Sequence, residues 1–112
     1  MREELLELLE NNKQVARLIT KDSLVFDALM IDNLIYRDSI NADQLAIAQA
    51  VTKGYKKGDF ETIYIATKSL KYININVLEE FFFPDDEITL ITKSFEKKIL
   101  VKELKSHYEV LR

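Results

Sequence analysis

The chain has 112 residues and a net charge of −3, and 47% of its residues are hydrophobic and 31% charged. These proportions exclude a disordered chain and predict one globular domain spanning residues 1–112. It contains no cysteine, which excludes disulfides, thiolate metal sites and cysteine nucleophiles. It shows neither a secretion signal nor the roughly 20-residue apolar run that a membrane helix needs, so we expect a cytoplasmic protein.

Three helices are predicted in the first half of the chain. The first spans residues 2–19, because apolar residues recur there at three- and four-residue intervals, although Asn11 and Asn12 weaken the pattern. The second runs from Asp22 to residues 36–37, and its apolar residues cover more than one face, which predicts extensive burial. The third begins at Ala42 after a cap at Asn41 and continues to Lys57.

Residues 60–83 form the densest apolar and aromatic region. Residues 62–65 have high β-propensity and favour a strand, but a helix over 60–70 also fits the apolar spacing. Residues 71–76 alternate between apolar and polar, which predicts a second strand. Asn76 and Glu79 have the spacing of a helix cap and its acidic partner, which predicts a short helix over 77–83 before Pro84.

The C-terminal part is predicted to begin with a strand at residues 87–93. Residues 99–101 fit its hairpin partner, followed by a closing helix over 102–111, while a single helix over 95–111 remains an alternative. The resulting fold class is α+β, with an N-terminal three-helix segment packed on a small C-terminal sheet and a terminal helix.

Signatures of catalysis are absent from the sequence. Its one histidine, His107, has no second imidazole or thiol to complete a metal site or a nucleophilic triad. The carboxylate pairs Asp32 with Asp38 and Asp85 with Asp86 do not match the spacing of a calcium loop. We therefore predict no enzyme activity, no cofactor and no metal site.

The segment with the strongest indication of function follows the predicted short helix. Three consecutive aromatic side chains cannot all point inward from a regular element, so at least one is expected at the surface, although an irregular turn that buries all three is an alternative. Exposed aromatic side chains rimmed by charge are typical of protein contacts, and acidic flanks favour a basic partner. The predicted contact residues are Phe81, Phe82, Phe83, Asp85, Asp86 and Glu87. The leading function is thus a non-catalytic interaction module, such as a bacterial or phage regulator, inhibitor or adaptor.

Two further functions are kept as alternatives. Leu45-Ala46 followed by Ala50-Val51-Thr52 resembles the middle of a phage-repressor helix-turn-helix, which implies a DNA-binding regulator, although two glycines interrupt the expected recognition helix. Acidic residues outnumber basic ones in both halves of the chain, which disfavours nucleic acid as the partner. The phosphate contacts of that alternative are Lys53, Tyr55, Lys56 and Lys57.

The other alternative is a homo-oligomeric assembly subunit. In a heptad frame over the first predicted helix, a buried asparagine falls at one core position, where it fixes pairing register in a coiled coil. The predicted dimer contacts are Leu5, Leu8, Asn12 and Val15.

Overall fold

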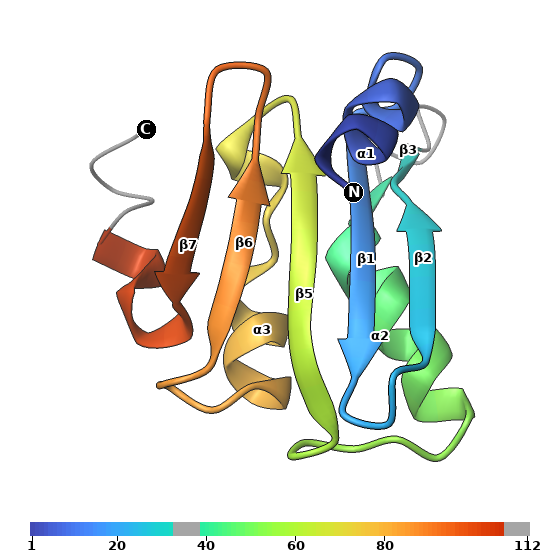
Figure 1. The fold of residues 1–112 in the computed structure, drawn as a ribbon, viewed down its shortest axis with the longest axis vertical. Helices are drawn as coiled ribbons and strands as arrows, with labels where there is room; N and C mark the ends of the chain where they lie inside the picture. The colour runs from blue at the N-terminus through green and yellow to red at the C-terminus, as the bar shows by residue number, and fades with distance from the viewer. Residues whose placement is uncertain (33–38, 107–112) are drawn as a thin grey trace.

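A computed structural model describes residues 1–32 and 39–106 of the chain. Its main feature is a five-stranded mixed sheet in the order β2-β1-β5-β6-β7, drawn from right to left in Figure 1. Helix α1 lies on one face of this sheet, and α2 and α3 lie on the other. The main elements are α1 (Arg2–Leu9), β1 (Gln14–Thr20), β2 (Val25–Leu29), α2 (Ala42–Thr52), β5 (Phe60–Thr67), α3 (Ile75–Phe81), β6 (Glu87–Ile91) and β7 (Glu96–Leu100).

Four short elements complete the described structure. Strands β3 (Ile31–Asp32) and β4 (Ser39–Ile40) pair with each other and lead into α2. The 3-10 helix η1 (Leu70–Tyr72) leads into α3, and η2 (Val101–Glu103) follows β7. None of the helices described is long and apolar enough to cross a membrane.

The sheet contains one parallel pair. Strand β1 runs antiparallel to both β2 and β5, and β6 runs antiparallel to β7, whereas β5 and β6 are parallel. Parallel neighbours need a crossover connection, and here that connection is the η1–α3 segment on one face of the sheet. The crossover brings α3 beside α2, which covers the same face.

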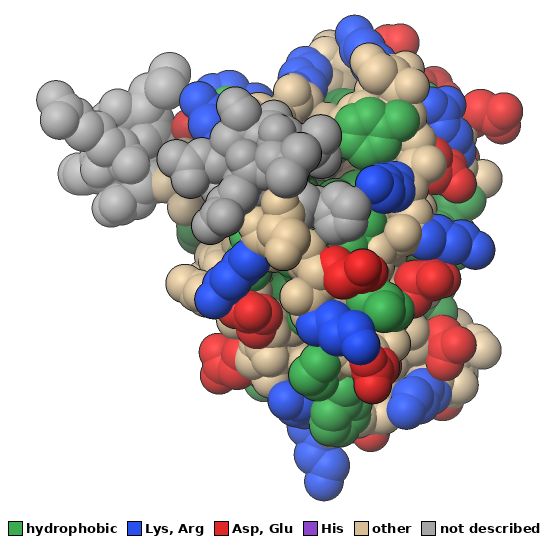
Figure 2. Space-filling model, turned by 90° about the vertical axis from the view of Figure 1, so that its left-hand side faces the viewer, with side chains coloured by type: hydrophobic (Ala, Val, Ile, Leu, Met, Phe, Trp, Pro, Cys, Tyr) green, Lys and Arg blue, Asp and Glu red, His purple; other side chains and the backbone are tan. Residues whose placement is uncertain are grey.

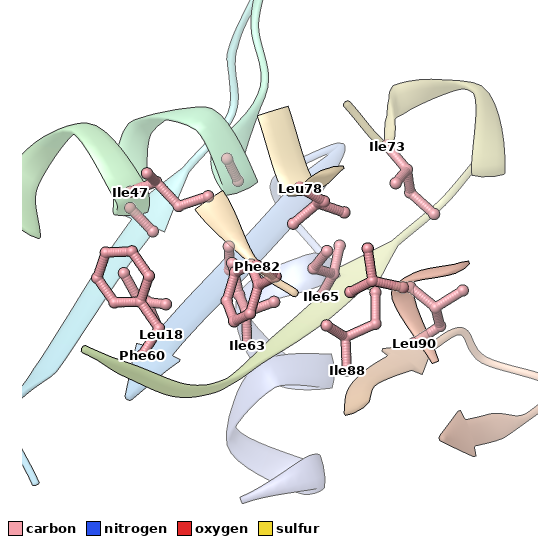
Figure 3. Close-up of a cluster of buried hydrophobic side chains, with 14 of the residues drawn as sticks. Leu18, Ile47, Phe60, Ile63, Ile65, Ile73, Leu78, Phe82, Ile88 and Leu90 are labelled. Carbon is pink, nitrogen blue, oxygen red and sulfur yellow. The ribbon is translucent and has the colours of Figure 1, made fainter. Parts of the chain in front are cut away.

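Alternating side chains on the central strands divide the core into two clusters. Val15 of β1 and Ala66 of β5 pack with Leu5 and Leu9 of α1. The larger cluster lies between the sheet and the pair α2 and α3 (Figure 3). Its labelled members are Leu18, Ile47, Phe60, Ile63, Ile65, Ile73, Leu78, Phe82, Ile88 and Leu90. Strand β5 therefore has helices on both of its faces, which explains its apolar and β-branched sequence.

The predicted helix over residues 2–19 is wrong beyond Leu9. The side chain of Asn12 donates a hydrogen bond to the carbonyl oxygen of Leu8, and the chain then turns into β1. Val15 and Ala16 point to opposite faces of the sheet, so the apolar residues that suggested a helical period serve two separate clusters.

The predicted helix from Asp22 to residues 36–37 is also wrong. Residues 25–29 form the edge strand β2, after a turn in which Ser23 has a φ of 71°. The apolar residues of this segment suggested a largely buried helix. In the strand, Ala28 is buried, whereas the side chains of Val25 and Leu29 are exposed. Residues 33–38 lie outside the described part of the chain.

The third predicted helix begins at Ala42 as expected, but α2 ends at Thr52 rather than at Lys57. It ends there because the turn that follows places Gly54 at a φ of +96°, a conformation that L-residues rarely adopt. The strand prediction for residues 62–65 is confirmed by β5, and the helical alternative for 60–70 is wrong.

The strand predicted at 71–76 is wrong, because these residues form η1 and the start of α3. The short helix after it exists, but its cap is Asn74 rather than Asn76, so it spans residues 75–81. The predicted hairpin exists, because β6 pairs antiparallel with β7, which excludes a single helix over 95–111. Its second strand spans residues 96–100 rather than 99–101, and Val101 begins η2. Of the closing helix, residues 107–111 lie outside the described structure.

The predicted fold class is therefore wrong in its architecture. A five-stranded sheet with helices interspersed along the chain replaces the three-helix segment on a small sheet, and only one helix precedes β1. The physical reason is that β1 and β2, both predicted as helices, belong to the same sheet as the C-terminal strands.

Adjacent phenylalanines after α3 provide a matched test of this packing. Phe82 is 1% exposed and Phe83 is 46% exposed. We expect Phe82→Ala to lower the free energy of unfolding by about 3–5 kcal/mol, because it leaves a cavity in the larger cluster. Phe83→Ala is expected to cost less than about 1 kcal/mol. Urea denaturation of both variants checks this, and equal losses would contradict the placement of Phe82.

Candidate functional site

Two segments that are distant in the sequence meet on the α2–α3 side of the sheet. One is the N-terminus of α2 at Asn41–Asp43, and the other is the segment from Tyr72 to Asn74 that leads into α3. Gln14, the first residue of β1, contacts both. Polar side chains from three parts of the chain thus converge at one place beside the larger core cluster.

Asp43 is a buried carboxyl group at this junction. One of its oxygens, Oδ2, accepts a hydrogen bond from the backbone N–H of Asn74 at 2.7 Å. The other, Oδ1, accepts one from the backbone N–H of Gln44 at 2.8 Å. Burial raises the pKa of Asp43 to about 6, while these two hydrogen bonds act in the opposite direction by favouring the charged form. Asp43 can therefore exchange a proton close to neutral pH.

Amide side chains surround this carboxyl. The Nδ2 of Asn41 donates to the carbonyl oxygen of Tyr72 at 2.6 Å, and the Nε2 of Gln14 donates to the same oxygen at 3.0 Å. The Oε1 of Gln14 accepts from the backbone N–H of Ala42 at 2.7 Å. Asn74 caps α3 by accepting from the backbone N–H of Val77. The site is thus a set of hydrogen-bonding groups around one titratable carboxyl.

A carboxyl with a pKa near neutrality can take two roles toward a polar ligand. When ionised, it accepts hydrogen bonds, and when protonated, it donates one and accepts another. Each carboxylate oxygen has two lone pairs, so the two backbone N–H groups do not exhaust the hydrogen-bonding capacity of Asp43. A perturbed pKa in such a setting is typical of functional carboxyl groups.

The fold matches solved structures of enzymes. A cytidine deaminase from Burkholderia pseudomallei aligns with a TM-score of 0.74 and 21% identity, covering 93% of this chain and 95% of that one. A cytidine deaminase from Mycobacterium leprae aligns with a TM-score of 0.60 and 12% identity, covering 88% and 89% of the two chains. No protein-family description and no curated relative matches the sequence. At these identities the likeness shows the fold.

These matches correct the functional expectation. The chain was predicted to be a non-catalytic interaction module and not an enzyme, and the fold is instead one that two named deaminases use. The helix-turn-helix alternative is overturned as well, because Thr52 is followed by a turn and by β5 rather than by a recognition helix. The assembly-subunit alternative loses its basis, because the continuous heptad helix does not exist.

The donor groups of this site do not fit zinc. Zinc deaminases hold their metal with one histidine or cysteine and two cysteines, in a pattern of ligand-x-Glu and Cys-x-x-Cys. Asn41-Ala42-Asp43 has the spacing of the first half, with an amide at the ligand position and Asp43 at the place of the glutamate. Amide and carboxyl side chains at this junction are not the imidazole or thiolate donors that zinc prefers.

The described part of the chain offers no substitute ligands. It contains no cysteine, and its one histidine, His107, lies outside the described residues. Within residues 1–32 and 39–106, no group of three or more histidine, cysteine, aspartate or glutamate side chains is arranged to hold a metal ion. The chemistry of this site therefore has to be derived from the carboxyl and amides alone.

The structure separates the aromatic residues of the predicted contact segment. Phe82 belongs to the larger core cluster, and Phe81 is partly buried against it. Phe83 is exposed, with the ammonium group of Lys57 at 4.9 Å from its ring centroid. Sequence reasoning gave all three the same role, whereas only Phe83 is well placed for contact with another molecule. That this surface binds a partner stays a prediction.

The acidic residues beside these phenylalanines already have partners within the chain. Asp85 forms an ion pair with Lys102 at 2.9 Å, and Asp86 accepts a hydrogen bond from the backbone N–H of Phe83. Glu87 begins β6 and is exposed. The side of the molecule nearest β7 shows acidic and basic side chains interspersed rather than segregated (Figure 2). The carboxylates therefore form no continuous acidic surface on this side.

The residues of the nucleic-acid alternative lie in the turn after α2. Lys53 caps that helix, and Lys56 and Lys57 are exposed. The hydroxyl group of Tyr55 donates to Asp22 at 2.8 Å, and its ring packs edge-on against Phe26. The turn is therefore anchored to the sheet, and its lysines project from a loop.

The residues of the predicted dimer contact are divided between two elements. Leu5 is buried and Leu8 is exposed on α1, whereas Val15 is buried in β1. Asn12 lies in the turn between them. They do not form one face.

The carboxylate pairs considered for metal binding are also accounted for. Asp32 forms an ion pair with Lys13, and Asp38 lies outside the described residues. Asp85 and Asp86 have the separate partners given above.

Sequence reasoning missed the site itself. Asn41 was predicted as a helix cap, and the connection of Asn41 and Asp43 to Gln14 and Asn74 has no local signal in the sequence. Asn41-Ala42-Asp43 has only the spacing of the first part of the zinc-deaminase signature, without its metal ligand, so the sequence carries no specific signal for this site.

Burial of Asp43 predicts a specific dependence of stability on pH. Its pKa is raised to about 6 in the folded protein from 3.8 in the unfolded chain, so the folded state binds the proton more tightly. The stability contributed by this tighter proton binding is fully present below the pKa of Asp43 in the unfolded chain. It is lost as the pH rises through the pKa of Asp43 in the folded protein.

We therefore expect the unfolding free energy of the wild type, relative to Asp43→Asn, to fall by about 2 kcal/mol between about pH 4 and about pH 7.5. Urea denaturation of both proteins across this range measures the difference. A constant difference between them would contradict the raised pKa.

Proposed function

We propose that this chain binds a pyrimidine nucleoside of the cytidine class at the junction of α2 and the segment leading into α3, with Asp43 as the group that contacts the base. The observation that carries the proposal is the buried carboxyl of Asp43 at the start of α2, in a fold shared with two cytidine deaminases. The cytidine deaminases supply the ligand class, because their fold covers nearly the whole chain.

The chemistry of a pyrimidine base suits a carboxyl with a pKa near neutrality. The exocyclic amino group of cytosine is a donor that an acidic side chain accepts. The ring nitrogen next to it is an acceptor, which a protonated carboxyl can satisfy. Asp43 has no exposed surface, so the junction has to open for it to contact a base. In its protonated form it can then pair with this edge of the base while it keeps the bonds from Asn74 and Gln44.

Activation of water by zinc does not enter this function. In zinc deaminases the metal lowers the pKa of a bound water, and the glutamate beside it moves protons. Here the residues at those positions offer proton transfer through Asp43 and hydrogen bonding through Asn41, without a metal-bound nucleophile. Any turnover of the ligand is accordingly expected to be independent of zinc.

Calorimetric titration with cytidine tests the binding. We expect the wild type to bind cytidine and Asp43→Asn to bind at least about tenfold more weakly, because the amide nitrogen that replaces one carboxyl oxygen cannot accept the backbone N–H bound by that oxygen, which leaves a buried donor unpaired at the contact. Asp85→Asn is the matched control, since it also removes one carboxylate, and that carboxylate is exposed and paired with Lys102. This control is expected to bind cytidine as the wild type does.

Absence of cytidine binding in the wild type would contradict the proposal, as would equal affinities of wild type and Asp43→Asn. Conversion of cytidine to uridine is measured in parallel, with added zinc and with a chelator. Equal rates under the two conditions are expected, and stimulation by zinc would overturn the metal-independent account of this site.

A further inference from the structure

Gln14 is a buried amide whose two ends join separate parts of the fold. It has no exposed surface, and its partners are 28 and 58 residues away in the sequence. Its Oε1 accepts the backbone N–H of Ala42, and its Nε2 donates to the carbonyl oxygen of Tyr72. One side chain of β1 therefore contacts both segments of the candidate site.

The bond to Ala42 replaces a local helix cap. The first N–H groups of a helix lack partners within the helix, and a preceding asparagine usually supplies one. Asn41 precedes α2, but its side chain makes no such bond and donates to Tyr72 instead. Gln14 and Asp43 accept the N–H groups of Ala42 and Gln44 in its place. The N-terminus of α2 is thus capped in part from another strand.

The second segment is held by the same set of groups. The carbonyl oxygen of Tyr72 accepts from both Gln14 and Asn41, which uses its two lone pairs. The N–H of Asn74 is bound by Asp43. In the described part of the chain, no buried side-chain nitrogen or oxygen lacks a hydrogen-bond partner. A buried polar network in which every group is satisfied gives rigidity and one defined arrangement.

These bonds connect the N-terminus of α2 with the segment leading into α3. A structural metal stabilises a fold by tying separate segments together. Here the nitrogen of Asn41 donates to a carbonyl group, and each oxygen of Asp43 accepts a backbone N–H, so the two segments are joined by hydrogen bonds within the protein.

We propose that Gln14 is the positioning residue of this site, and that its amide, in place of a metal ion, fixes the N-terminus of α2 against the segment leading into α3. The proposal concerns how the site is held together. It stands or fails independently of whether cytidine binds there.

Hydrogen exchange of individual backbone amides, followed by NMR, tests this role. Gln14→Met keeps a side chain of similar length and removes both hydrogen bonds. We expect the amides of Ala42 and Asn74 to exchange at least about tenfold faster in this variant, while the amide of Ile65 in β5 keeps its rate. A variant that only weakened the whole fold would speed up all three.

Asn41→Ala is the second variant, and it changes a half-buried side chain. It removes one of the two bonds to Tyr72 and leaves the bond from Ala42 to Gln14. It is therefore expected to speed up exchange at Asn74 and to leave Ala42 unchanged. Gln49→Leu is the matched control, because it removes an exposed glutamine with one side-chain bond, to Asp27, and it should change neither amide.

Added zinc tests the claim that these segments are held together without a metal ion. Added zinc is expected to leave the exchange rates of Ala42 and Asn74 in the wild type unchanged and to show no stoichiometric binding by calorimetry. Slower exchange at these amides with zinc would overturn the proposal. Unchanged exchange in Gln14→Met would also overturn it, as would faster exchange at Ala42 in Asn41→Ala.

Discussion

The hydrogen bonds that join β1, α2 and the segment leading into α3 are the interaction on which the rest of this site depends. Gln14 and Asp43 hold the two segments together across 28 to 58 residues of sequence. The parallel pairing of β5 and β6 requires the crossover that brings α3 beside α2, and the apolar cluster beneath them supports that arrangement. Because Asp43 is buried by this packing, its carboxyl has a raised pKa.

The elements that could be predicted from the sequence are those set by local signals. Strand β5 has a dense run of β-branched and aromatic residues, and α2 begins after an asparagine. Strands β1 and β2 could not be recognised from their apolar residues. Those of β1 lie on both faces of the sheet, and some of those of β2 are exposed at its edge, so their spacing in the sequence resembles that of a helix. The sheet that decides their structure depends on the pairing of β1 with β5, whose residues lie 40 to 53 positions further along the chain.

The site was missed for the same reason. Asp43 looks like an ordinary acidic residue in the first turn of a helix, and its partner Asn74 is 31 residues away. The aromatic triplet attracted attention instead, yet Phe82 belongs to the core and Asp85 and Asp86 bind other residues of the chain. Composition indicated correctly that thiolate chemistry is excluded, but it could not show that the fold is one in which such chemistry is usual. The chain thus shares its fold with two cytidine deaminases, and at the start of α2 it has a buried acid, Asp43, without any cysteine in the sequence.

Crystals of the protein grown with excess zinc and cytidine, measured on both sides of the zinc absorption edge, give the most direct test of the central claim. The account predicts no anomalous peak between α2 and the segment leading into α3. It also predicts that Asp43 stays bonded to the N–H of Asn74 and faces the base of the nucleoside. An anomalous peak at this junction, with Asp43 or Asn41 turned toward it, would contradict the account.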